Sequence, residues 1–196
     1  MTMDPKKVLI ILDPGHGGKD PGAVFDAVQE SSFNLSIALK IRMHLEKLLP
    51  YAQVLLTRES DVYVSLADRV AFCNKYIISE INHVFFVSIH CNAALSDLAR
   101  GMEVYVSQMT RRSRLSDRMA NCISNALSRA GWKIRKNLNT AFKQANFYVL
   151  NHTLCPAVLV ENLFITNAED RKLLKENWPE LARLEAVGIA TFIKTL

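Results

Sequence analysis

Two histidines and two glutamates of this sequence have the side chains that a catalytic zinc site needs. His16 lies in the glycine-rich segment "LDPGHGG", directly after the apolar run "VLIIL". His90 and Glu161 lie at the ends of the apolar runs "HVFFVSIH" and "PAVLVEN", and Glu30 begins a helical pattern. Two imidazoles and one carboxylate commonly hold a catalytic zinc ion with an open position for water. A further carboxylate can serve as a general base, so these residues predict metal-assisted hydrolysis.

The spacing of these residues alone leaves other interpretations open. The two histidines are 74 positions apart, which is a weaker signal than a compact H-E-x-x-H motif. His16 could be a surface residue of a turn, His90 a hydrogen-bonded core residue, and Glu161 a cap. We predict that the other three histidines, His44, His83 and His152, lie outside the site. The loop that contains His152 nevertheless leads towards Glu161.

Short apolar runs bounded by turns predict the strands that would position these side chains. The strands are expected at residues 7–12, 52–58, 83–90, 101–107 and 156–162. The run at 101–107 alternates apolar and polar residues, which is typical of a strand with one partly solvated face.

Helical spacing of apolar residues predicts the elements between these strands. Helices are expected at residues 32–49, 66–77, 115–130, 168–174 and 179–194. Ser65 and Asn167 can cap helices, Pro50 and Gly131 can end them, and Pro179 can begin the last one. Strands that alternate with helices predict an α/β fold with helices on both faces of the sheet. Ligands of such sheets bind outside the carboxyl ends of the strands, where Asp13, His16, His90 and Glu161 would meet.

The composition fits one globular domain. The chain has 196 residues, 49% of them hydrophobic and 22% charged. No apolar run approaches the roughly 20 residues of a membrane span, and "VLIIL" is too short for a signal peptide core. The four cysteines form no C-x-x-C pair, so we expect buried free thiols rather than a zinc knuckle or a disulfide framework.

The net charge of +5 is concentrated in one part of the chain. Residues 111–143, here called the basic segment, contain nine Lys and Arg and one acidic residue, Asp117. Such a segment can attract nucleic acid or an anionic cell-wall polymer, or it can be a solvated helix face and loop. Its few aromatic residues, Trp132 and Phe142, and the lack of a known motif argue against nucleic acid.

The ordered motifs resemble one known family. They are "ILDPGHGGKDPGA", Glu30 followed by "NLSIALKI", "LTRESDVYVSLADRVAFCN", "FVSIHCNAA", "GMEVYV" and "FYVLNHTLCPAVLVENLFITN". In this order they resemble the zinc-dependent N-acetylmuramoyl-L-alanine amidases, the type-3 amidases of bacterial cell walls and phage lysins. The resemblance covers essentially the whole chain. It implies a twisted, mostly parallel sheet of about six strands flanked by helices.

The resemblance also implies residue roles. His16, Glu30 and His90 would bind one zinc ion, and Glu161 would be the catalytic carboxylate. The substrate would be peptidoglycan, cleaved between N-acetylmuramic acid and the L-alanine of the stem peptide. Several further residues are expected in supporting roles: Arg58, Asp61 and Arg69 in an ion-pair network under the site, Asp13 holding the His16 loop or orienting a ligand, and Asn92 binding substrate.

The sequence departs from the family pattern in two places. Leu163 stands where the family usually has a glycine, which would reshape the loop beside the site. Some members insert a long helix after the second zinc histidine, and this helix blocks the metal. In this sequence only residues 91–100 separate His90 from Gly101. Ten residues cannot hold such a helix and its connections, so we expect an open site.

Two alternative functions remain open from the sequence. One is a zinc peptidase that cuts within the stem peptide, and the other is a wall-binding module without catalysis. We expect residues 1–196 to form a single catalytic domain without a separate wall-binding domain, and to be a monomer. We expect it to act at the cell wall, outside the cytoplasm. Because the sequence has no export signal, it would be a lysin released by other means, or a host autolysin whose signal has been removed.

Overall fold

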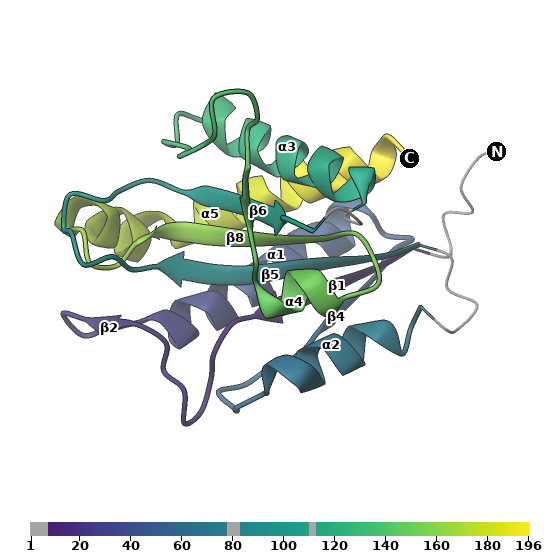
Figure 1. Cartoon of the computed structure of the whole chain (residues 1–196), viewed down its shortest axis with the longest axis horizontal. Coiled ribbons are helices and arrows are strands. Elements are labelled where there is room, and N and C mark those ends of the chain that lie inside the picture. The colour runs from purple at the N-terminus through teal and green to yellow at the C-terminus, as the bar shows by residue number, and fades with distance from the viewer. Residues whose placement is uncertain (1–7, 78–82, 110–112) are drawn as a thin grey trace.

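A single central sheet organises the molecule (Figure 1). The computed structural model describes residues 8–77, 83–109 and 113–196. The sheet has six strands, in the spatial order β4 (Gln53–Leu56), β1 (Val8–Pro14), β5 (His83–Asn92), β8 (Ala157–Phe164), β6 (Glu103–Ser107) and β7 (Lys143–Ala145). All neighbours pair in parallel except β6 and β8, which are antiparallel. The predicted α/β fold with a mostly parallel sheet is therefore confirmed.

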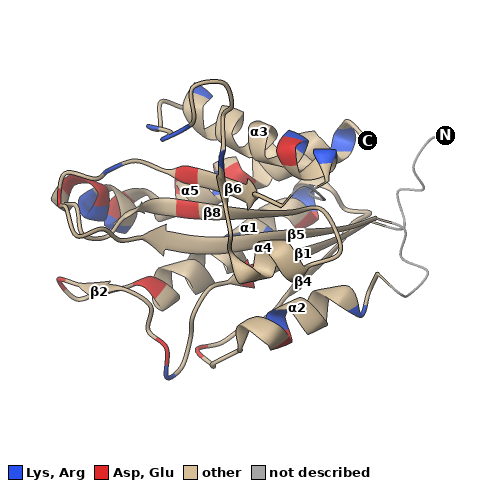
Figure 2. Cartoon of the chain, viewed as in Figure 1, with Lys and Arg blue, Asp and Glu red and all other residues tan. Residues whose placement is uncertain are grey.

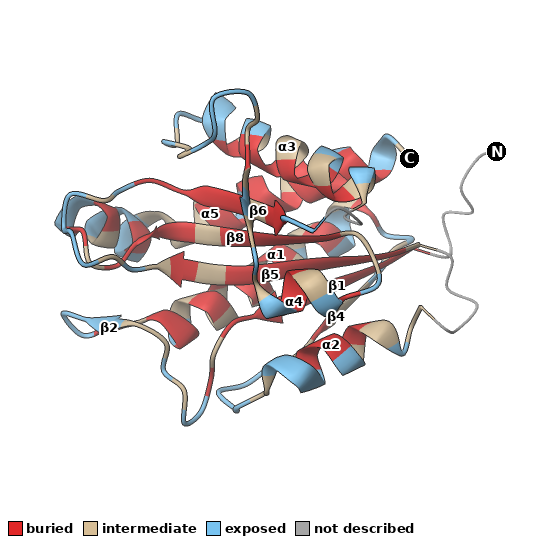
Figure 3. Cartoon of the chain, viewed as in Figure 1, coloured by how far each residue is buried: buried red, intermediate tan, exposed pale blue. Residues whose placement is uncertain are grey.

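Helices cover both faces of the sheet and bury its apolar side chains. The helices of the larger core are α1 (Glu30–Leu48), α3 (Arg114–Arg129) and α5 (Ala168–Lys194). The other face packs against α2 (Leu66–Asn74) and the short α4 (Tyr148–His152). Figure 3 shows the central strands buried along most of their length. All seven residues of β1 are buried, as expected for a strand with helices on both sides.

Two predicted helix caps are present. The Ser65 side chain accepts a hydrogen bond from the backbone N–H of Asp68 at the start of α2. The Asn167 side chain accepts one from Asp170 N–H at the start of α5. These bonds satisfy N–H groups that have no partner within the first turn of a helix.

The predicted break at Pro179 is wrong. One helix, α5, runs from Ala168 through Pro179 to Lys194 instead of two shorter helices. Proline in a helix removes one backbone hydrogen bond, but Leu174 and Leu181 on either side of it are fully buried. Packing of both halves against the same core outweighs this local preference.

The predicted solvated face of residues 101–107 is also wrong. All residues of β6 are buried except Tyr105, which is half-buried. Both faces of β6 are covered, because Val104 and Val106 belong to the larger core and Tyr105 packs against the smaller one. The short elements β7 and α4, and the hairpin of β2 (Val24–Phe25) and β3 (Val28–Gln29), were not predicted from the sequence. No helix of the described residues is long and apolar enough to span a membrane.

Candidate functional site

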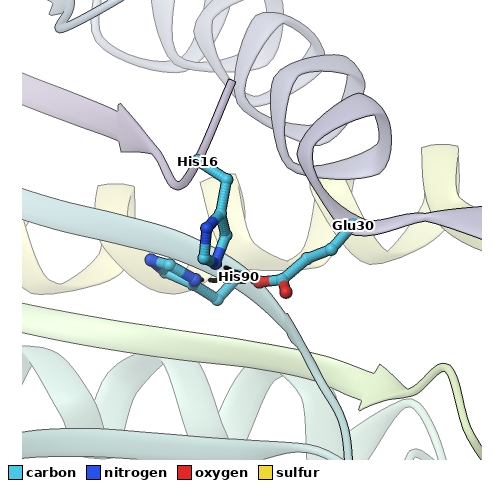
Figure 4. A group of neighbouring side chains, drawn as sticks. All are labelled: His16, Glu30 and His90. Atoms are coloured by element: carbon cyan, nitrogen blue, oxygen red, sulfur yellow. Dashed lines mark hydrogen bonds and ion pairs between the residues drawn. The ribbon is translucent and has the colours of Figure 1, made fainter. Parts of the chain in front are cut away.

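Three of the predicted site residues converge beyond the carboxyl ends of the central strands (Figure 4). His16 follows β1, His90 lies near the end of β5, and Glu30 begins α1. Glu30 Oε1 lies 3.2 Å from His16 Nε2 and 2.9 Å from His90 Nδ1. One donor atom from each residue lies within 4.8 Å of the others. This is the donor set that the sequence predicted for zinc.

The backbone around His16 has an unusual conformation. His16 has a φ of 60°, and Gly17 and Gly18 have φ values of 126° and 59°. This left-handed region favours glycine, so His16 is held there against its own preference. Gly15 has a different role, because a Cβ on this residue would overlap the ring of His90. The missing Cβ of Gly15 thus makes room for the ring of His90 beside the His16 loop.

A carboxylate that the sequence analysis missed orients His16. Asp20 Oδ2 lies 2.9 Å from His16 Nδ1. An acceptor at Nδ1 favours the tautomer that leaves Nε2 free to bind a metal. The four-residue spacing of His16 and Asp20 is the only sequence signal for this contact. Asp13, which was the candidate for such a role, does not contact either imidazole in the described hydrogen bonds.

Backbone and amide groups fix the carboxylate of Glu30. Its Oε2 accepts a hydrogen bond from Ala23 N–H at 3.0 Å, and its Oε1 accepts from Asn34 Nδ2 at 3.3 Å. Burial alone would raise the pKa of Glu30, but hydrogen bonds with His16 and His90 outweigh it and hold the pKa well below its ordinary value. Glu30 is therefore an anion at neutral pH, as a metal ligand must be.

Asp13 and the two arginines hold the His16 loop from behind. Arg69 Nη1 lies 2.7 Å from Asp13 Oδ1 and also donates to the carbonyl of Pro14. Arg69 Nη2 donates to the carbonyl of His16. Arg58 donates to the carbonyls of Pro14 and Gly15. In the predicted network, Arg69 forms an ion pair with Asp13. Asp61 instead accepts a hydrogen bond from the N–H of Gly18.

Glu161 lies beside the three convergent side chains. It is the register partner of His90 in the pairing of β5 with β8, and it lines the same cavity of about 500 Å³. Its buried Oε2 has no hydrogen-bond partner in the described part of the chain. Burial, and then the charges of Glu30 and Glu103, raise the pKa of Glu161 well above its ordinary value.

Glu103, which the sequence analysis did not single out, lies directly across from Glu161 on β6. Figure 2 shows the two acidic positions side by side on β6 and β8. Glu103 Oε1 accepts from Arg135 Nε at 2.7 Å and from Lys143 Nζ at 2.5 Å. Its Oε2 accepts from Asn92 Nδ2 at 2.8 Å, which fixes the amide of Asn92 at the cavity wall.

Leu163 occupies a position that favours glycine. It has a φ of 65° two residues after Glu161, and its side chain is buried in the larger core. The β5–β8 pairing shifts register at this point, between His90 and Asn92. The family departure found in the sequence thus coincides with a strained backbone conformation.

Apolar side chains form two walls of the cavity. Tyr63 and Leu66 come from the start of α2 and the segment before it, and Phe147 and Tyr148 come from the start of α4. Residues 93–100, where some family members insert a blocking helix, contain no helix and form a short loop. The cavity is accordingly open in this structure, as predicted.

The other predicted features lie away from the convergent residues. His44 lies within α1 and His83 begins β5, while His152 stacks on Tyr148 with ring centroids 4.0 Å apart.

The four cysteines are free thiols, as predicted, but only two of them are buried. Cys73 and Cys91 are buried, whereas Cys122 and Cys155 are partly exposed.

Two cations of the basic segment, Arg111 and Arg112, lie outside the described residues. The exposed cations of the segment are Arg114, Arg118, Arg129, Lys133 and Lys136.

Comparison with known proteins decides the family. Residues 10–191 match the family model described as N-acetylmuramoyl-L-alanine amidase. The chain belongs to this family. It is 35% identical over 190 residues to a sporulation-specific N-acetylmuramoyl-L-alanine amidase of Bacillus subtilis, covering 93% of this chain and 67% of the relative. It is 34% identical to the endolysin of Bacillus phage SPP1, covering 94% of this chain and 66% of the endolysin.

Solved amidase structures share the fold over nearly the whole chain. The catalytic domain of the amidase CwlV from Bacillus (Paenibacillus) polymyxa var. colistinus has a TM-score of 0.79 and 31% identity, covering 96% of this chain and 97% of that one. An amidase of Clostridium difficile 630 has a TM-score of 0.81 and 27% identity, covering 97% and 96%. This amidase chain spans only 31% of the length of a third relative, the amidase LytC of Bacillus subtilis. The family membership makes the chain a hydrolase of the peptidoglycan amide bond.

Proposed function

We propose that this amidase uses one zinc ion held by His16, Glu30 and His90, with Glu161 as the general base and acid. The bond cleaved is the amide between the lactyl group of N-acetylmuramic acid and the L-alanine of the stem peptide. The observation that carries the proposal is the juxtaposition of three convergent donors with a buried, unpartnered carboxylate in one open cavity.

The donor set fits zinc. Two imidazole nitrogens and one carboxylate oxygen are typical ligands of a catalytic zinc site, and three protein ligands leave a position open. Asp20 holds the His16 ring from behind, as carboxylates do in many zinc sites. When bound, zinc supplies a Lewis acid that stabilises negative charge on the carbonyl oxygen and promotes ionisation of water.

Glu161 transfers the proton. As a carboxylate it takes a proton from the attacking water, and as a carboxylic acid it delivers this proton to the leaving nitrogen. The product is then an amine rather than an amide anion. Burial raises the pKa of Glu161 in the metal-free protein, and a cation bound beside it would favour the carboxylate that must accept the proton. Attack and departure occur on adjacent atoms, so one side chain serves both steps.

Asn92 is the candidate for binding the substrate beside this carboxylate. Its side-chain nitrogen donates to Glu103 and its Oδ1 accepts from Ala93 N–H at 2.9 Å, so the amide plane is fixed. An amide NH₂ has two hydrogens, and the second can donate to a substrate carbonyl. The fixed orientation lowers the entropy cost of forming that bond.

Replacement of Glu161 by Gln tests the proposal. Loss of the general base should lower peptidoglycan hydrolysis by about 10²–10⁴-fold, while zinc content measured on the purified protein stays at that of the wild type. Glu59→Gln is the matched control, because Glu59 is an exposed glutamate paired with Arg42. Replacing His16 or His90 with Ala should instead lower the zinc content.

Product analysis separates the amidase from its alternatives. Mass spectrometry of digested peptidoglycan should show a new L-alanine amino terminus with intact glycan, and a chelator should abolish it. Cleavage within the stem peptide would indicate a peptidase, and wall binding without product would indicate a silent module. Activity of Glu161→Gln within a few-fold of the wild type would refute the assigned role.

We also propose that the chain acts on the wall as a monomer. A single cavity contains all four candidate residues, so the proposed chemistry needs no second copy. Light scattering of the purified protein tests this, and a stable dimer at working concentration would contradict it.

A further inference from the structure

Two cysteines that are distant in the sequence face each other in the fold. Sγ of Cys73, near the end of α2, lies 3.4 Å from Sγ of Cys155, in the loop between α4 and β8. The two residues are 82 positions apart, and both are free thiols. The sulfurs of a disulfide are about 2.05 Å apart, so an approach of roughly 1.4 Å would allow the bond to form.

Other contacts hold the same two segments together. Asn74 Nδ2 donates to the carbonyl of His152 at 3.0 Å, and the N–H of Leu154 donates to Asn74 Oδ1 at 2.9 Å. Cys73 is fully buried in the smaller core, and Cys155 packs against that core. The two thiols therefore face each other because of packing and hydrogen bonds that do not depend on the sulfurs.

We propose that Cys73 and Cys155 form a site of oxidative modification, which a small-molecule disulfide converts into an intramolecular disulfide. The more exposed thiol, Cys155, attacks a sulfur of the small disulfide as its thiolate and releases one small thiol. Cys73 then attacks the sulfur of Cys155 in the mixed disulfide and releases the second small thiol. The two cysteines lose two protons and two electrons, and the small disulfide is reduced to two thiols.

The thiol environment sets the rate of this reaction. The hydrogen bond with Cys73, and then burial, raise the pKa of the Cys155 thiol. Little thiolate is present at neutral pH, and only the thiolate is the nucleophile. The oxidation should therefore be slow at pH 7 and faster in alkaline buffer.

The bond would link the two walls of the cavity. The start of α2 contributes Leu66 and Arg69 to the cavity lining, and α4 contributes Tyr148 and Val149. Cys73 lies near the far end of α2, and Cys155 lies in the loop that follows α4. A covalent link there would restrict separation of α2 from α4 without placing a new group in the cavity.

Oxidised glutathione provides the direct test. The folded full chain is incubated with it at pH 8.5, alkylated with iodoacetamide and digested with trypsin without reduction. We expect residues 70–75 to be joined to residues 144–171, with two of the four cysteines protected from alkylation. We also expect Tm to rise by about 5–10 °C and to return on treatment with dithiothreitol.

Single substitutions provide the controls. Cys155→Ser should abolish the joined peptide and the Tm shift, and Cys73→Ser should do the same. Because Cys73 is fully buried, Cys155→Ser keeps the test valid if the other variant fails to fold. Cys122→Ser is the matched control, since Cys122 is another partly exposed thiol, and it should behave as the wild type.

Three results would overturn the proposal. These are four alkylated cysteines after prolonged oxidation, a glutathione adduct that persists on Cys155, or a joined peptide that contains Cys122. None of these readouts depends on amidase activity, so the thiol site and the proposed zinc mechanism succeed or fail separately.

Discussion

Side chains that form hydrogen bonds with metal ligands hold these ligands in place and strengthen metal binding. Asp20 illustrates this, because it contacts the ring nitrogen of His16 that faces away from Glu30. Its carboxylate is partly exposed, so the contact contributes little to folding but fixes the ring and its tautomer.

Replacement of Asp20 by Asn should therefore weaken zinc binding more than folding. We expect the zinc dissociation constant to rise by about 10–100-fold, with Tm of the metal-free protein changed by less than about 2 °C. Competition with a chromophoric chelator measures the affinity. Asp26→Asn is the control, since Asp26 is an exposed carboxylate paired with Arg171 away from the ligands. Equal affinities of the two variants would contradict the role of Asp20.

Prediction from the sequence identified the candidate ligands, which lie together in the structure, but it missed two carboxylates near them, Asp20 and Glu103. His16, His90 and Glu161 could be identified because each lies at the end of an apolar run that forms a strand. The role of Glu103 could not be identified, since its partners Arg135 and Lys143 are 32 and 40 positions away. Contacts of this kind depend on the spatial order of strands, which local patterns do not encode.

At the scale of elements, β8 combines the candidate base with a strained backbone. Leu163 keeps a φ of 65° because its side chain is buried in the larger core. The left-handed conformation costs about 1–2 kcal/mol for a residue with a Cβ, and glycine avoids this cost.

A pair of substitutions at Leu163 measures this strain. Both Leu163→Ala and Leu163→Gly lose a buried side chain and should destabilise the protein by about 2–5 kcal/mol. The Gly variant should be at least as stable as the Ala variant, because only glycine relieves the strain. At Val160, a buried position of the same strand without positive φ, Gly should be less stable than Ala by about 1 kcal/mol. Urea unfolding gives these values, and an equal glycine penalty at both positions would refute the strain.

The elements that the sequence predicted well are those in which local and global preferences agree. Ser65 and Asn167 cap helices where expected, and the apolar runs of β1 and β5 form buried central strands. Pro179 is the opposite case, because its local preference predicts a helix start and the packing of α5 overrides it. Such a conflict can be resolved only when the core on both sides of the proline is known.

At the scale of the whole molecule, one buried acid couples stability to pH. Glu185 of α5 is fully buried, and the side chain of Asn162 only partly offsets the effect of this burial on its pKa. Burial raises the pKa of Glu185 to about 8, from an ordinary value of 4.5. Between these values the folded protein keeps a proton that the unfolded chain loses, so stability falls as pH rises through this range.

Replacement of Glu185 by Gln should remove this dependence. Relative to the variant, the wild type should lose on the order of 4 kcal/mol of unfolding free energy between pH 4.5 and pH 8, and little above it. Denaturant titrations across this pH range measure the difference. Glu176→Gln, an exposed glutamate of the same helix, should leave the wild-type pH dependence unchanged. A pH-independent difference for Glu185→Gln would contradict the raised pKa.

The basic segment is our candidate for attraction to anionic wall polymers. Arg135 and Lys143 are already paired with Glu103, so the attraction would rest on the exposed cations such as Lys133 and Lys136. Replacing both lysines with Gln should weaken binding to isolated walls at low salt and reduce its salt dependence. The matched control replaces Lys172 and Lys175 of α5, two other exposed lysines, with Gln. Binding that does not change with salt in the wild type would exclude this electrostatic attraction.

The position of β8 has a consequence for the order in which the molecule assembles during synthesis. It is the last strand in the sequence, yet it lies between β5 and β6, which are made earlier. A nascent chain that ends before residue 157 lacks β8, which joins β5 to β6 in the sheet, and it also lacks Glu161. Long-range pairing of this kind forms late in folding. A chain built in this way acquires its proposed base together with its final strand, so we expect chains that stop before residue 157 to lack hydrolytic activity.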